Sequence, residues 1–182
     1  MTAEPLAPRL PPIEQLNRLG EPDFADRLTL LFESAPRLAA ALSKERPFAS
    51  YDALLDRAEA IVAALPEREQ VEIVNAHPRI GEDAASVRRT SAQSYREQGY
   101  DREAALDREQ VERAYRDLDA LNRAYEARFG FRFVVFVDGR PKAQIVDVMR
   151  ARLDHPHQEE MATALRDMLL IARDRLRSLA PP

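Results

Sequence analysis

The chain has 182 residues, of which 45% are hydrophobic and 32% are charged, and its formal net charge is -4. This composition is typical of one soluble globular domain, and no apolar run approaches the roughly 18 residues of a membrane-spanning helix. The absence of cysteine excludes disulfides, thiolate nucleophiles and sulfur-ligated metals, and the interleaved charges form no basic stripe for nucleic acid. Because the N-terminus also lacks the pattern of a secretion signal, we expect a cytoplasmic protein that binds neither membranes nor nucleic acid.

The first twelve residues contain four prolines and have little to bury, so we expect a flexible arm over 1–12 and a folded domain over 13–180. Apolar residues then recur at helical spacing. The most regular stretch runs from Leu54 to Leu65, with Ser50 as a suitable N-cap and Pro66 at its end. Shorter helical patterns cover Ile13–Leu19, Phe24–Phe32, Leu38–Leu42 and Val71–Val74.

The middle of the chain contains a histidine at the end of a predicted helix. His77 must lie outside the helix of residues 67–76, because a residue before proline is disfavoured in the α conformation. Residues 81–89 are polar and poorly patterned, and Thr90 or Ser91 can cap a helix that includes residues 94–98. Two long helices are predicted over residues 108–129 and 158–179, the first ending at Gly130.

Residues 131–137, between these long helices, are rich in aromatic and β-branched side chains and are expected to be extended. Asp138-Gly139 favours a turn, but Pro141 and the helical spacing of Ile145, Val148, Met149 and Arg152 argue against a returning strand. The chain is therefore predicted to be all-α, a single-domain bundle of about seven to nine helices with one extended segment near 131–137.

Three groups of polar residues are candidates for chemistry. His77 on a turn could act as an acid or base near neutral pH, although an isolated buried histidine more often only satisfies hydrogen bonds. Ser94, Glu97 and Gln98 share one helical face and could bind a planar, urea-like group, although residues of these types more commonly form a solvated surface. Arg152 lies on an apolar helical face, where it could bind an anion or extend to solvent from the helix end.

No recognised metal or nucleotide motif is present. His155-Pro156-His157 has no further ligand at a known spacing, which favours an exposed loop and leaves no metal site predicted. Phosphate-binding loops, dinucleotide-binding fingerprints, the G-x-S-x-G elbow and H-E-x-x-H are all absent from the sequence. The residues by themselves indicate a helical domain with a possible acid–base site that needs no cofactor.

The order of five short motifs resembles a known family. These are Glu45-Arg46-Pro47-Phe48, Ala76-His77-Pro78, Ser94-x-x-Glu97-Gln98, the stretch from Leu121-Asn122 to Phe133 that contains Phe129-Gly130-Phe131, and Arg152-Leu153. Together they resemble the 2-oxo-4-hydroxy-4-carboxy-5-ureidoimidazoline (OHCU) decarboxylases over residues 13–178. The resemblance implies an all-helical, often dimeric enzyme without a cofactor, which removes carbon dioxide from a ureidoimidazoline to form (S)-allantoin in urate degradation.

The resemblance also implies which residues form the site. His77, Glu97 and Arg152 match catalytic positions. Residues that match the substrate-binding positions are Pro78, Ser94, Gln98, Phe131, Phe133, Val134 and Val135. Arg132 stands where the family often has proline, and from its alternation with Phe131 and Phe133 we expect it to point outward.

Two other classes of protein stay open at this point. A binding or scaffold domain could keep the fold without activity, and a metal-dependent enzyme could use His77 with His155 or His157.

Overall fold

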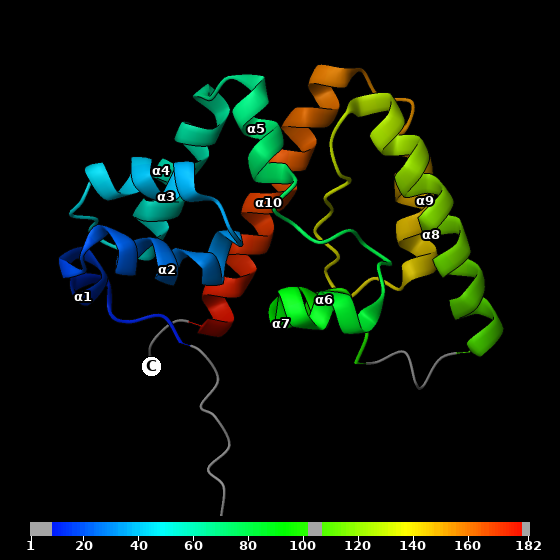
Figure 1. Ribbon diagram of the computed structural model, residues 1–182, viewed down its shortest axis with the longest axis horizontal. Coiled ribbons are helices and arrows are strands. Elements are labelled where there is room, and N and C mark those ends of the chain that lie inside the picture. The colour runs from blue at the N-terminus through cyan, green and yellow to red at the C-terminus, as the bar shows by residue number, and fades with distance from the viewer. Residues whose placement is uncertain (1–8, 102–106, 180–182) are drawn as a thin grey trace, which may run out of the picture. The chain divides into compact units, whose positions relative to one another are not determined.

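The computed structural model describes residues 9–101 and 107–179, and within these ranges the chain forms ten α-helices and no β-strand (Figure 1). The predicted all-α class is confirmed. There is one helix more than the expected seven to nine, because the polar stretch after Gly81 forms α6 (Ala84–Thr90). Asp83 caps α6 by accepting a hydrogen bond from the N–H of Ser86 at 2.8 Å, which compensates for the missing apolar repeat. In the described ranges, no helix combines the length and the apolar character needed to cross a membrane.

The chain divides into two compact units. The first comprises residues 1–65 and 169–182. It contains α1 (Ile13–Arg18), α2 (Glu21–Phe32), α3 (Pro36–Lys44), α4 (Tyr51–Ala64) and the second half of α10 (His157–Leu179). Its core is built from apolar residues spaced as the sequence predicted, among them Phe24, Leu28, Leu31, Phe32, Leu42, Leu54 and Leu55.

Ordered packing in this first unit begins before residue 13. Leu10 is buried and donates its N–H to the carbonyl of Leu179 at 3.0 Å, and the Tyr51 hydroxyl donates to the carbonyl of Pro11 at 2.7 Å. Residues 1–8 of the expected arm lie outside the described residues. Ser50 caps α4 as predicted, accepting from the N–H of Ala53 at 3.1 Å.

The second unit comprises residues 66–168. It contains α5 (Glu67–Val74), α6, α7 (Ala92–Glu97), α8 (Arg108–Phe129), α9 (Lys142–Arg152) and the first half of α10. Gly130 ends α8 in the left-handed conformation with φ +77°, as its position in the sequence predicted. All the predicted catalytic and substrate-binding residues belong to this unit.

The extended segment between α8 and α9 is part of the core of the second unit. Phe131 and Phe133 are 1% and 2% exposed and pack edge-on against Tyr125 of α8, with ring centroids 5.8 and 5.2 Å away. Val134, Val135 and Val137 are also buried. The aromatic and β-branched composition therefore provides an extended wall within a helical unit, as expected.

Candidate active site

His77 lies on a constrained turn after α5. Its N–H donates to the carbonyl of Val74 at 3.2 Å, and only 4% of the residue is exposed. Further along the turn, the amide of Asn122 donates to the carbonyl of Ile80 at 2.9 Å. The turn thus presents a buried imidazole from a backbone that is anchored to both α5 and α8.

The end of α7 is tied to the same turn through Gln98. Its side-chain amide donates to the carbonyl of Arg79 at 3.3 Å, and its Oε1 accepts from the N–H of Gly81 at 3.3 Å and from the Tyr100 hydroxyl at 3.0 Å. Ser94 and Gln98 are buried and Glu97 is half-buried, so their helical face is not the solvated surface that composition alone allowed. The structure therefore brings α7 to the segment that directly follows His77-Pro78.

Arg132 also meets the His77 turn, and here the expectation of an outward, surface-only side chain is corrected. Its guanidinium Nη1 donates to the carbonyl oxygens of Asn75 and His77, at 3.0 Å each. Alternation does place Arg132 opposite Phe131 and Phe133, but that side faces the end of α5. The last carbonyls of a helix have no partner within it, and they provide acceptors for an arginine.

Arg152 is the centre of a buried ion cluster. Its Nε donates to Glu160 Oε1 at 2.7 Å, and its Nη1 lies 3.0 Å from both Asp167 Oδ2 and the carbonyl of Val134. Its guanidinium carbon lies 4.5 Å from the centre of the Phe133 ring. Burial raises the pKa of Asp167, and the charge of Arg152 opposes that rise. The carboxylates of Glu160 and Asp167 thus account for the positive charge of Arg152 on an apolar helical face.

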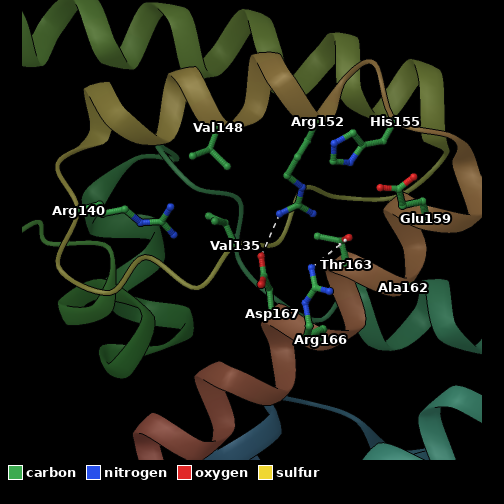
Figure 2. Close-up of a pocket in the computed structure, with 10 residues that line it drawn as sticks. All are labelled: Val135, Arg140, Val148, Arg152, His155, Glu159, Ala162, Thr163, Arg166 and Asp167. Atoms are coloured by element: carbon green, nitrogen blue, oxygen red, sulfur yellow. Dashed lines mark hydrogen bonds and ion pairs between the residues drawn. The ribbon is translucent and has the colours of Figure 1, made fainter.

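Arg152 borders a hollow of about 420 Å³, shown in Figure 2 with the ion pair to Asp167. Arg140, Arg152 and Arg166 approach it from different elements, and Val135 and Val148 are among its apolar lining. None of the residues that line it belongs to the His77 turn or to α7. Arg152 is connected to the histidine through the extended wall, by way of Val134 and Arg132.

Lys142 is a further residue near the site that the sequence reasoning missed. It is 7% exposed, and its Nζ donates to the carbonyl of Gln98 at 2.9 Å. The same nitrogen lies 4.0 and 5.1 Å from the ring centroids of Tyr100 and Tyr115. Its position three residues before Ile145, on the apolar face of α9, was a signal of the kind that identified Arg152.

The other two histidines have carboxylate partners. His155 Nδ1 lies 3.0 Å from Glu160 Oε2, and His157 Nε2 lies 2.7 Å from Glu67 Oε1. Within residues 9–101 and 107–179, no three or more His, Asp or Glu side chains cluster in a way that could hold a metal ion.

The fold and the site define an all-helical protein in which a buried histidine, a buried amide and an extended backbone wall are held together by hydrogen bonds. Such an arrangement suits acid–base chemistry on a small molecule. Residues 17–177 match the OHCU decarboxylase family. The chain belongs to that family.

Individual relatives agree with this assignment. The chain is 32% identical to the 2-oxo-4-hydroxy-4-carboxy-5-ureidoimidazoline decarboxylase of Haloferax volcanii over 169 residues, which cover 90% of this chain and 93% of the relative. A crystal structure of OHCU decarboxylase in the presence of (S)-allantoin has a similar fold, with a TM-score of 0.62 at 20% identity over 85% of this chain and 96% of that chain. An (S)-allantoin synthase gives a TM-score of 0.66 at 22% identity over 93% of this chain, which spans 54% of that chain.

Proposed function

We propose that this protein decarboxylates 2-oxo-4-hydroxy-4-carboxy-5-ureidoimidazoline to (S)-allantoin in urate degradation, without a cofactor. Family membership supports the reaction. The observation that carries the site assignment is the buried His77, on a turn that Gln98 and Arg132 bind from two other segments. A fixed acid–base group beside hydrogen-bonding side chains is what a stereospecific decarboxylation requires.

The reaction breaks the bond between the carboxylate carbon and the ring carbon that also bears the hydroxyl. Carbon dioxide leaves, and the electron pair of that bond stays with the ring until a proton arrives. We assign His77 to the hydroxyl or the scissile carbon. Because the scissile carbon becomes a carbonyl when the hydroxyl loses its proton, the S configuration is set by delivery of a proton to one face of the neighbouring ring carbon, which bears the ureido group. Buried, preorganised dipoles stabilise such developing charge more than water does.

Substrate orientation is assigned to the remaining predicted residues. Ser94, Glu97 and Gln98 bind the ureido and ring nitrogens, and Pro78 lines the pocket beside them. We assign the wall residues Phe131, Phe133, Val134 and Val135 to the ring or ureido oxygens, which they bind through the backbone. Arg152 as a direct ligand of substrate oxygens stays a prediction, because its guanidinium donates to the wall at the carbonyl of Val134.

Replacing His77 by alanine tests the acid–base role. General acid–base help is typically worth about 10² to 10⁴ in rate, so we expect His77→Ala to lose activity by this factor. Circular dichroism of chiral allantoin formed from freshly generated substrate measures the loss. His155→Ala is the matched control and should keep its turnover. Wild-type turnover in His77→Ala would show that the assigned role is wrong.

The same assay with the wild-type protein separates the three classes of function. A dichroic signal that resists a chelator supports the proposed enzyme, and a signal that a chelator abolishes supports a metal-dependent one. Absence of any signal supports a scaffold domain.

We also propose a cytoplasmic homodimer, which the resemblance to an often dimeric family supports. Light scattering coupled to size-exclusion chromatography tests the dimer, since a monomeric mass at micromolar concentration would contradict it. Fractionation of the source cells tests the location.

A further inference from the structure

We propose that Arg132 is a positioning residue that sets the place of His77 relative to the substrate-binding wall, an inference that rests on the proposed decarboxylase function. Its Nη1 donates to the carbonyls of both Asn75 and His77 at 3.0 Å. Its backbone N–H donates to Asn75 Oδ1 at 2.8 Å. Three hydrogen bonds from one residue therefore join the wall to the end of α5.

The chemistry of the turn explains why an arginine is effective there. Asn75 is the C-cap of α5 and His77 lies two residues beyond it, so neither carbonyl belongs to the hydrogen-bond ladder of the helix, and Pro78 contributes no N–H to the turn. A cation at a helix C-terminus also interacts favourably with the helix dipole. Because one nitrogen of a planar guanidinium binds both carbonyls, the positions of Asn75 and His77 are fixed together.

The backbone of His77 is thereby held at both ends. Its N–H is bound to the carbonyl of Val74 at 3.2 Å, and its own carbonyl is bound to Arg132. Arg132 directly precedes Phe133, where the backbone assigned to substrate oxygens continues. The same residue thus sets the spacing between the acid–base group and the wall.

Loss of the Arg132 guanidinium should shift the position of the His77 turn without unfolding it. Gln98 still binds the turn from the side of α7, at Arg79 and Gly81, and Asn122 still binds Ile80. A displacement of about 1 Å in a catalytic geometry can cost about 10² in rate. Loss of the Arg132 guanidinium should therefore lower the turnover rate more than the stability of the fold.

Three variants test the role by steady-state kinetics. Arg132→Met removes the donors, and Arg132→Lys keeps the charge and one donor nitrogen. Arg46→Met is the control, because Arg46 is also half-buried and donates to backbone carbonyls, those of Ser43 and Leu19, but belongs to the first unit, which contains none of the predicted site residues.

We expect Arg132→Met to lower kcat by about 10 to 100-fold while KM changes by less than about 3-fold, since positioning acts on the reacting geometry. Arg132→Lys should recover part of that loss, and Arg46→Met should keep kcat within about 2-fold of wild type. A kcat for Arg132→Met within about 2-fold of wild type would overturn the proposal.

A second measurement needs no substrate and so separates this inference from the proposed function. The chain has three histidines, His77, His155 and His157, whose imidazole NMR signals can be assigned by single substitutions. Arg132→Met should shift the signals of His77 and leave those of His155 and His157 in place. An unmoved His77 signal refutes the positioning role, whereas an inactive wild-type protein with a shifted signal refutes only the decarboxylase assignment.

Discussion

Gly81 shows how a single residue constrains the His77 turn. It adopts φ +75°, a conformation that side chains with a Cβ rarely occupy, and an added Cβ would lie 2.9 Å from Leu118 Cδ1. Leu118 is fully buried in α8, and its Cβ would also lie 3.0 Å from the added atom, so a change of rotamer alone would not remove the clash. Both backbone conformation and packing therefore require glycine at this position.

Gly81→Ala is expected to destabilise the protein more than Gly130→Ala. Both glycines have a positive φ, which costs alanine about 1 kcal/mol, but an added Cβ at Gly130 meets nothing within 4 Å. The clash with Leu118 should add about 1–3 kcal/mol at Gly81. Urea unfolding of the two variants measures the difference, and equal losses would show that Leu118 yields without cost.

The ion cluster around Arg152 acts between elements. It connects the last turn of α9 with the first turns of α10 and with the extended wall, through Glu160, Asp167 and Val134. Glu160 is fully buried and also accepts from the Tyr125 hydroxyl at 2.5 Å. Its carboxylate therefore depends on these partners for its charge to be tolerated in the core.

Arg152→Met should destabilise the protein by about 3–5 kcal/mol, because it leaves a buried carboxylate without its strongest partner. The matched control is Arg150→Met on the same helix, which breaks an exposed pair with Asp117 at 2.9 Å and should cost at most about 1 kcal/mol. Adding Glu160→Gln to Arg152→Met should recover part of the loss. If urea unfolding gave equal losses for the two arginine variants, the cluster would not have the stabilising role assigned to it.

Each of the two units of the molecule contains a tyrosine whose neutral form the fold favours. Burial raises the pKa of Tyr51 in the first unit from 10.0 to about 12. Burial, followed by the hydrogen bond and charge of Glu160, raises the pKa of Tyr125 in the second unit. In both cases the pKa of the tyrosine is higher in the folded than in the unfolded protein. The contribution of the two neutral tyrosines to the free energy of unfolding is therefore complete below pH 10 and is lost as the pH rises.

Stability should therefore fall in alkaline solution. Between pH 10 and about 12 the unfolded chain releases the Tyr51 proton and the folded chain keeps it, which costs about 1.4 kcal/mol per pH unit. Tyr51→Phe should flatten this slope, and it should lower stability at pH 7 by about 1 kcal/mol through loss of the hydrogen bond to Pro11. Chemical unfolding at several pH values measures both effects, and an unchanged slope would contradict the prediction.

The sequence predicted most of the helices because their signals are local. Ser50, Pro66 and Gly130 mark helix ends through their own backbone preferences, and the apolar spacing in α4 and α8 identifies the buried faces. α6 was missed because its apolar pattern is weak and only its cap at Asp83 indicates a helix. The ordered motifs that indicated the family are likewise visible along the chain, and the family assignment is confirmed.

The contacts that shape the candidate site depend on residues far apart in the sequence. Alternation placed Arg132 opposite its aromatic neighbours, but it could not show that the end of α5 occupies that side. The place of Arg152 on an apolar helical face was predicted with two possible roles, whereas its burial and its ion pairs with Glu160 and Asp167 depend on side chains of α10. The sequence by itself thus determined the helices, the extended segment and the candidate residues, because these depend on local backbone preference and spacing. Only the tertiary structure decided which carbonyl or carboxylate each buried cation meets, because such partners are set by long-range packing.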